Sequence, residues 1–269
     1  MSDRVAILGA GKMGEALLSG IVRAGRPTSD LVVTTHNSGR ADILRERYGV
    51  EITDNGTAVT SAGTIVIAVK PQDMGELLDD IAPLLTVDHL VVSVAAGITT
   101  SFIERRVPVD IPVIRVMSNT PVLVDEAMSA ISAGSHATEE HLALAEGLLK
   151  PVGRTLRVPE SQQDAVTALS GSGPAYFFYL VEAMIDAGIL LGLPRSVAHD
   201  LIVQTAIGSA VMLRDSGEPP QTLREAVMSP AGTTIAAIRE MEDHKVRAAF
   251  LAALEAARDR SRELASGHE

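Results

Sequence analysis

The feature that most constrains the fold is a short apolar run followed at once by closely spaced glycines. Val5–Leu8 has the composition of a buried strand, Gly9, Gly11 and Gly14 follow in the spacing G-x-G-x-x-G, and Glu15–Val22 continues as a helical pattern. Strand, glycine turn and helix in this order form the first half of a dinucleotide-binding βαβ unit. The sequence therefore predicts a parallel sheet with crossover helices.

The glycine turn predicts where a pyrophosphate binds. The first glycine permits the tight turn, the second allows the backbone to approach the phosphates, and the third allows the helix to pack against the strand. The helix N-terminus supplies free N–H groups and the positive end of its dipole. The alternative is an ordinary glycine-rich turn. The residues expected to contact the cofactor here are Gly9, Ala10, Gly11, Lys12, Met13 and Gly14.

The first half of the chain alternates strand and helix signals, which is typical of an α/β Rossmann domain with a mostly parallel sheet. Strands are expected at Val5–Leu8, Leu31–Thr35, Thr64–Val69, Leu90–Val94 and Val113–Met117, helices at Arg40–Tyr48, Met74–Leu85 and Glu139–Leu149, and edge strands at Ala127–Ala133 and Thr155–Val158. We place this dinucleotide-binding domain at residues 1–160.

The second half, residues 161–269, reads as an all-α domain. Helical patterns cover Ala175–Leu191, Val197–Ser216, Thr222–Met228, Thr233–Asp243 and Val246–Glu263, and Ser266–Glu269 is expected to fray. Ala198–Met212 is apolar around most of its circumference, so that helix must be buried. So few helices cannot bury so much apolar surface among themselves. The pattern therefore predicts a homodimer formed through the C-terminal helices.

Composition excludes several classes of function. The net charge of −11 argues against nucleic acid or an anionic membrane as the main partner. The chain has no cysteine, which excludes disulfides, thiol nucleophiles and thiolate metal sites, and no metal site is expected. Neither a signal-peptide pattern nor an apolar run of membrane-spanning length is evident, so we expect a cytoplasmic protein.

The residues after the second strand indicate which nicotinamide cofactor binds. An NAD site usually has a carboxylate about 20 residues past the glycines, for the ribose 2′-hydroxyl. Here His36, Asn37 and Arg40 follow the strand, and the first carboxylate is Asp42. A guanidinium with small donors suits a 2′-phosphate. NADPH is therefore favoured, NADH stays possible, and the alternative makes Arg40 a solvated residue.

Two further strand ends are placed to cover the cofactor, because ligands of open α/β sheets bind at the carboxyl ends of strands. The residues concerned are Ala68, Val69, Lys70 and Pro71 after the third strand, and Ala95 and Ala96 after the fourth. Pro71 can begin a helix at its first position, and Lys70 is either a cofactor contact or solvated.

Two segments of the second half place hydroxyls before a helical pattern. Leu169–Ala175 and Ser229–Thr234 each combine serines or threonines with glycine and proline, so both are candidate anion sites at a helix start. Simple helix capping is the alternative for either. Ser229–Thr234 is the better candidate, because a loop of small residues can surround a carboxylate with N–H groups.

These motifs together resemble pyrroline-5-carboxylate reductase. The resemblance spans nearly the whole chain and is carried by Gly9–Gly14, Ala68–Gln72, Ala95–Gly97, Arg115–Pro121, Asp164–Ala175 and Ser229–Thr234. It implies a Rossmann domain followed by a helical dimerisation domain, with rings of dimers in some members. It also implies hydride transfer from NAD(P)H to the C=N carbon of 1-pyrroline-5-carboxylate, giving L-proline.

The resemblance also assigns roles to single residues. It implies that Ser229, Ala231, Gly232, Thr233 and Thr234 bind the substrate, that the Thr234 hydroxyl contacts the imine nitrogen as the catalytic residue, and that Asn55 contacts the cofactor. Ser118 stands where the family usually has proline, which is expected to loosen that loop.

Two other functions stay open on the residues alone. One is a dehydrogenase of hydroxy acids, which usually needs a lysine or histidine base in the second domain. The helical patterns of the second half contain His199 and His244, with Lys245 beside the latter, and none lies in a glycine-rich loop. The other is a nucleotide sensor or scaffold without catalysis, for which the second anion site would be unnecessary.

Overall fold

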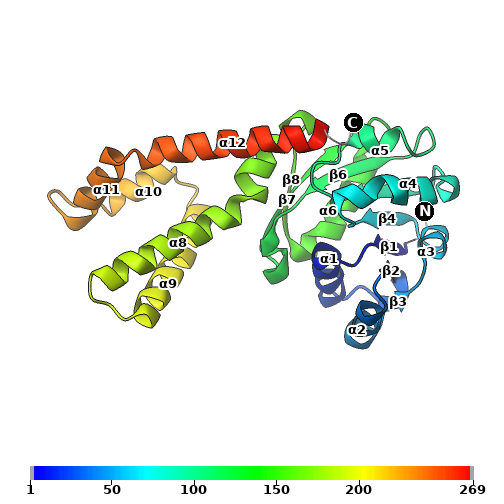
Figure 1. Cartoon of the computed structure of the whole chain (residues 1–269), viewed down its shortest axis with the longest axis horizontal. Helices are drawn as coiled ribbons and strands as arrows, with labels where there is room; N and C mark the ends of the chain where they lie inside the picture. The colour runs from blue at the N-terminus through cyan, green and yellow to red at the C-terminus, as the bar shows by residue number, and fades with distance from the viewer. Residues whose placement is uncertain (1–2, 267–269) are drawn as a thin grey trace. The chain divides into compact units, whose positions relative to one another are not determined.

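The chain forms two compact units in a computed structural model, which describes residues 3–266 (Figure 1). The first unit is Met1–Ser172 with Ala257–Glu269, and the second is Gly173–Ala256. From the sequence we expect the first domain to end at residue 160, whereas the first compact unit extends to Ser172. Of the residues expected to fray, Ser266 ends the last helix and 267–269 lie outside the described part.

The first unit is built on an eight-stranded sheet of order β3-β2-β1-β4-β5-β6-β7-β8. The strands are β1 (Val5–Leu8), β2 (Leu31–Thr34), β3 (Glu51–Ile52), β4 (Thr64–Ile67), β5 (Leu90–Ser93), β6 (Val113–Met117), β7 (Ala127–Ala133) and β8 (Gly153–Arg157). All neighbours pair in parallel except β6 and β7. The predicted mostly parallel Rossmann sheet is thus confirmed, with β3 as a strand that sequence analysis missed.

Helices cover both faces of this sheet. They are α1 (Lys12–Arg23), α2 (Ser38–Tyr48), α3 (Asn55–Ser61), α4 (Met74–Ile81), α5 (Thr100–Glu104) and α6 (Glu139–Leu149), with 3₁₀ turns η1 (Thr28–Asp30), η2 (Pro71–Asp73), η3 (Ala82–Leu84), η4 (Thr120–Val124), η5 (Lys150–Val152) and η6 (Glu160–Gln162). Two apolar clusters result, because successive strand residues point to opposite faces. Val5 and Ile7 pack with α1 and α6, whereas Ala6 and Leu8 pack with α3, α4 and α5.

A π-helical turn leads out of the first unit. The chain passes from α7 (Gln163–Val166) through the turn η7 (Thr167–Gly171) into α8 (Gly173–Leu190). The Ser172 N–H donates to the Thr167 carbonyl at 2.8 Å. The sequence predicts a helix start with free N–H groups for this segment. That expectation is wrong, because the π-turn continues the helical hydrogen bonding through the glycines.

The second unit is entirely helical, as predicted. It contains α8, α9 (Arg195–Asp215), α10 (Pro220–Ala226), α11 (Thr233–Asp243) and the first half of α12 (Val246–Ser266). Helices α8 and α9 pack closely where Gly188 faces Ala198, since a Cβ on Gly188 would lie 2.9 Å from the Ala198 Cβ. The turn between them has Gly192 at φ +94°, a conformation that favours glycine.

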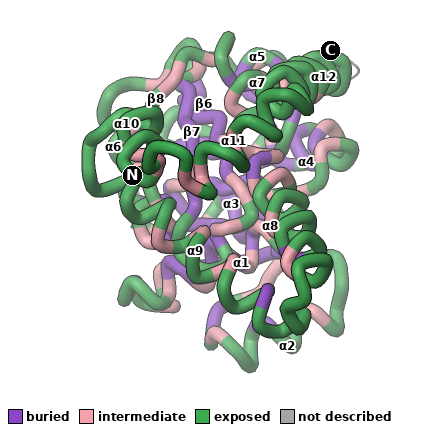
Figure 2. Tube along the Cα trace, turned by 90° about the vertical axis from the view of Figure 1, so that its left-hand side faces the viewer, coloured by how far each residue is buried: buried purple, intermediate pink, exposed green. Residues whose placement is uncertain are grey.

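The helices of the second unit leave large apolar side chains uncovered. Figure 2 shows buried residues gathered in the strands, whereas α8, α9 and α11 are mostly exposed. Phe177, Phe178 and Tyr179 are exposed on α8, as are Leu201 and Met212 on α9. An exposed apolar surface of this size marks an interaction site.

Two helices, Glu160–Leu190 and Arg195–Asp215, are long and apolar enough to cross a membrane by length and composition. No single apolar run of that length is expected from the sequence, and neither helix contains one. The apolar residues are instead spread over whole helices among small and polar ones. The core helix of a soluble protein passes the same test of length and composition.

Replacing Gly9 by alanine should destabilise the first unit by about 1–3 kcal/mol, because φ is +90° there and a Cβ would lie 2.6 Å from the Val69 side chain. Gly147→Ala is the matched control on α6, where nothing lies within 4 Å. That change should stabilise by about 0.5–1 kcal/mol. Chemical denaturation measures both, and equal effects would contradict the close approach at Gly9.

Candidate active site

The glycine turn is held at the carboxyl ends of two neighbouring strands. The N–H groups of Gly9 and Ala10 donate to the Thr34 carbonyl, at the end of β2, at 3.2 and 3.0 Å. The Gly11 N–H turns back onto the Gly9 carbonyl at 2.8 Å. A Cβ on Gly14 would lie 2.5 Å from the Gly9 carbonyl oxygen, so α1 approaches the turn as closely as the motif requires.

The first turn of α1 is open to a ligand. Gly11 is its N-cap and no side chain caps the helix, so the N–H groups of the first turn have no side-chain acceptor. Nothing lies within 4 Å of the position that a Cβ on Gly11 would take. This combination of bare N–H groups and an unobstructed backbone fits the pyrophosphate of a dinucleotide.

The residues after β2 also lie at this edge of the sheet. Asn37 caps α2 by accepting the Arg40 N–H at 3.0 Å. The Arg40 guanidinium reaches back to the glycine turn, where Nε donates to the Ala10 carbonyl and Nη2 forms an ion pair with Glu15 at 2.6 Å. The structure therefore joins Arg40, predicted on its charge alone, to the turn that would hold the pyrophosphate.

A cavity of about 440 Å³ opens at the end of β2, where the Thr34 carbonyl accepts from the glycine turn. Its lining includes the predicted His36 and Asn55, together with residues that sequence analysis did not select, namely Thr34, Thr35, Thr53, Asp54, Gly56 and Asp80. Asp54 and Asp80 bring two carboxylates into a region that appears free of them when only β2 is considered. The signal missed is the short strand β3, whose end delivers Asp54.

Both carboxylates already have local partners. Asp54 caps α3 and accepts from the Thr57 N–H and hydroxyl, both at 2.8 Å. These bonds, the backbone one foremost, lower the pKa of Asp54 below its usual 3.8, so the group stays ionised at neutral pH. Asp80 accepts from the Asn55 amide at 3.3 Å. Asn55 is thereby oriented on the cavity wall.

The ends of β4 and β5 complete this edge. The Ala68 N–H donates to the Leu8 carbonyl at 2.8 Å, which aligns β4 beside β1. Val69 packs against Gly9, Lys70 is exposed, and Pro71 begins η2 at its first position, as predicted. After β5, Ala95 is buried and Ala96 is exposed. The residues of the first unit that we expect to bind the cofactor therefore follow β1, β2, β4 or β5. The exception is Asn55, which begins α3.

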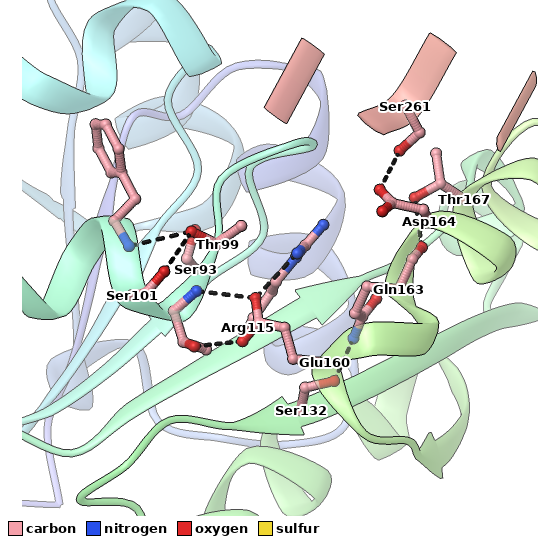
Figure 3. A network of polar contacts seen from close by, with 12 residues as sticks. Ser93, Thr99, Ser101, Arg115, Ser132, Glu160, Gln163, Asp164, Thr167 and Ser261 are labelled. Atoms are coloured by element: carbon pink, nitrogen blue, oxygen red, sulfur yellow. Dashed lines mark hydrogen bonds and ion pairs between the residues drawn. The ribbon is translucent and has the colours of Figure 1, made fainter. Parts of the chain in front are cut away.

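A polar network connects the start of α5, just after the loop that follows β5, to the segment after β8 (Figure 3). The Glu160 carboxylate accepts from the Thr100 N–H at 2.9 Å, from the Thr100 hydroxyl, and from Arg115 at 3.0 Å. Gln163, fully buried, donates to the Ser132 hydroxyl at 2.7 Å. One carboxylate thereby ties the N-terminus of α5 and strand β6 to the segment that leads toward α8.

The end of α12 joins the same network. The Ser261 hydroxyl donates to Asp164 at 2.7 Å (Figure 3). Helix α12 also passes near Gly97, where a Cβ would lie 4.0 Å from Leu264 and Ala265. The part of α12 from Ser261 to Ala265 therefore packs beside the loop after β5. This contact differs from the expected division of the chain, which places these residues in the second domain.

The loop after β6 is anchored by its own side chains. Ser118 is 7% exposed, and its hydroxyl accepts from Ser129 on β7 at 2.9 Å. Asn119 accepts the Met128 N–H at 3.1 Å and donates to the Ser170 carbonyl at 3.3 Å. The expected loosening at Ser118 is thus offset by a buried hydrogen bond that proline cannot make.

The loop Ser229–Thr234 in the second unit forms a compact turn. The Gly232 N–H donates to the Ser229 carbonyl at 3.0 Å, and a Cβ on Gly232 would lie 2.2 Å from the Ser229 hydroxyl oxygen. Ala231 has φ +57°, a strained conformation that in non-glycine residues clusters at ligand sites. Gly232 is the N-cap of α11, and no side chain caps this helix.

This turn can bind an anion. The first N–H groups of α11, which include those of Thr233 and Thr234, lack a side-chain cap, and the hydroxyls of Ser229, Thr233 and Thr234 lie in the same short segment. A carboxylate fits such a helix start. Within residues 3–266, no group of three His, Cys, Asp or Glu residues is placed to hold a metal ion.

Each half of the chain matches a known protein family. Residues 160–264 match the family model described as pyrroline-5-carboxylate reductase dimerisation, and residues 4–97 match the one described as NADP oxidoreductase, coenzyme F420-dependent. Pyrroline-5-carboxylate reductase of Corynebacterium melassecola is 44% identical over 97% of this chain and 98% of its own length. The chain belongs to the pyrroline-5-carboxylate reductase family.

Solved structures of this family share the fold over their full length. The reductase of Coxiella burnetii superposes with a TM-score of 0.93 at 33% identity, covering 98% of this chain and 99% of the other. The Plasmodium falciparum pyrroline carboxylate reductase, solved with NADP bound, gives 0.87 at 28% identity, covering 97% and 98%. The region that matches the dimerisation model of the family includes α8 and α9, which supports oligomerisation.

Glu160→Ala should destabilise the protein by about 2–3 kcal/mol, because it leaves the Arg115 guanidinium, 4% exposed, without its carboxylate. The value lies below that of a fully buried pair, since Glu160 is 26% exposed. Arg115→Met should cost less, because the remaining carboxylate keeps Thr100 and reaches water. Denaturant unfolding of both variants measures the order, and the reverse order would contradict this account.

Proposed function

We propose that this chain reduces 1-pyrroline-5-carboxylate to L-proline, with NADPH as the preferred hydride donor and NADH as a possible one. The observation that carries the proposal is the pair of uncapped helix starts in a chain of this family, one at the glycine turn and one at Ser229–Thr234. The first suits the cofactor's pyrophosphate and the second suits a carboxylate substrate.

On the cofactor side, the assignment of roles follows the geometry of the first unit. The Gly9–Gly14 turn and the first N–H groups of α1 would hold the pyrophosphate. Arg40, with His36 and Asn37, would hold the 2′-phosphate that distinguishes NADPH from NADH. Asn55 would line the adenosine side, and the residues after β4 and β5, Ala68–Pro71 with Ala95 and Ala96, would cover the cofactor.

On the substrate side, the carboxylate of the cyclic imine would be held by the N–H groups of Ala231, Gly232 and Thr233, with the Ser229 hydroxyl as a further donor. A substrate anchored by its carboxylate presents its ring in one orientation. The Thr234 hydroxyl would then contact the imine nitrogen as the catalytic residue.

The chemistry asks little of the protein beyond positioning. When bound, NADPH supplies a hydride to the C=N carbon, and the nitrogen ends with one proton, so the imine becomes a secondary amine. A protonated imine is already electrophilic, which explains why hydroxyls can suffice where a hydroxy-acid dehydrogenase needs a base. Thr234 orients the nitrogen and relays its proton from water, and proximity provides most of the rate.

The oligomer and location complete the proposal. A homodimer through α8 and α9 would cover the exposed Phe177, Phe178 and Tyr179, and a ring of such dimers would be a further level of assembly. We assign the protein to the cytoplasm, with neither nucleic acid nor membrane as a partner.

Incubating the protein with 1-pyrroline-5-carboxylate and NADPH should consume NADPH with formation of proline, followed by absorbance at the NADPH band. Initial rates with each nicotinamide should favour NADPH. Oxidation of hydroxy acids in place of imine reduction would indicate the dehydrogenase alternative, and binding without turnover would indicate a sensor.

Thr234→Ala should lower kcat/KM for the imine about 10- to 100-fold, because the nitrogen loses its hydrogen-bond partner. Thr234→Ser should retain most of the activity, since it keeps the hydroxyl. Thr222→Ala, on exposed α10, is the matched control and should be unaffected. Unchanged kcat and KM in Thr234→Ala would exclude this role.

A further inference from the structure

One carboxylate, Glu15, gathers three donors of α2 at the start of α1. It accepts from Arg40 Nη2 at 2.6 Å, from Arg47 Nη1 at 2.8 Å and from the Tyr48 hydroxyl at 3.1 Å. Its side chain is only 18% exposed. Glu15 follows Gly14 directly, so this cluster is attached to the glycine turn itself.

The cluster holds Arg40 from two sides. Glu15 binds Nη2, and the Ala10 carbonyl accepts from Nε. These two contacts fix the plane of the guanidinium at the ends of β1 and β2. Nη1 has no hydrogen-bond partner within residues 3–266, so a donor stays available for an incoming acceptor.

We propose that Glu15 is a positioning residue that sets the preference for NADPH over NADH, by holding Arg40 ready for the 2′-phosphate. The inference rests on the proposed function, which assigns Arg40 to that phosphate. Arginine has many rotamers, and ordering it before the cofactor arrives removes that entropic cost from binding.

The negative charge of Glu15 acts in the opposite direction, because it repels a phosphate. Glu15, Arg40 and Arg47 together still carry one net positive charge, so the phosphate meets an attractive site. The repulsion between Glu15 and a phosphate acts through solvent and is screened by salt, whereas the direct contact of Arg40 with Glu15, which is 18% exposed, is screened much less. We therefore expect placement to outweigh repulsion.

This expectation fixes the sign of the test. Charge alone predicts that Glu15→Ala binds NADPH more tightly, since the cluster becomes more positive. Placement predicts that it binds NADPH more weakly, by about tenfold, with NADH affinity within about twofold of the wild type. Glu15→Gln, which keeps an acceptor oxygen, should lie between the wild type and Glu15→Ala.

The experiment is titration of the full chain with NADPH and with NADH, followed by nicotinamide fluorescence or calorimetry at low and high salt. Arg40→Ala should lose NADPH affinity as well, and the double variant should be no weaker than Arg40→Ala alone. Asp42→Asn is the matched control. Asp42 pairs with Arg45 on α2, so this substitution removes one negative charge and leaves the contacts of Arg40 in place.

The outcomes separate the two proposals. Equal loss of NADPH and NADH affinity in Glu15→Ala, or unchanged or tighter NADPH binding, would overturn the role of Glu15. A wild-type chain that binds neither nucleotide would instead overturn the proposed function. A tenfold loss confined to NADPH, which persists at high salt, would support Glu15 as the positioning residue.

Discussion

The close approach of three backbone segments at Gly9 is the constraint on which the cofactor region depends. Gly9 lies between the end of β2, through the Thr34 carbonyl, and the end of β4, through Val69. A side chain here would separate these strands and move the start of α1. The proposed pyrophosphate site consists of backbone N–H groups, so its geometry depends directly on the position of the backbone.

At the same edge of the sheet, polar contacts fix the positions of side chains that follow the strands. Glu15 and the Ala10 carbonyl place Arg40, while Asp80 orients Asn55. Farther along the sheet, Glu160 ties the N-terminus of α5 to Arg115. Each contact joins elements that are remote in sequence, so each orders a segment that composition alone would treat as mobile surface.

The second unit follows a different principle. Its helices satisfy their backbone internally, yet they leave aromatic and aliphatic side chains exposed. Such helices resemble membrane spans in composition. Both helices lie within residues 160–264, the region that matches the dimerisation model of the family. Apolar surface that one chain cannot bury is consistent with an assembly of chains.

The sequence by itself determined the strand–turn–helix start, the Rossmann sheet and the helical second half, because each depends on local periodicity and on glycines whose conformation no other residue adopts easily. It also selected Arg40 and the Ser229–Thr234 loop through charge and small-residue content. Only the tertiary structure decided what those residues touch. Glu15 has no special signal in the sequence, and its role follows from a crossing of α1 and α2 that brings together residues 25 positions apart.

Three other features could be identified only from the tertiary structure. The π-turn at Thr167–Gly171 uses glycines and serines that read as a helix start, because hydrogen bonding to the fifth residue leaves no distinct sequence pattern. The carboxylates of Asp54 and Asp80 meet in one cavity through β3, a strand of two residues. The return of α12 to Asp164 is a long-range contact, and periodicity carries information about the face of a helix but not about its partner.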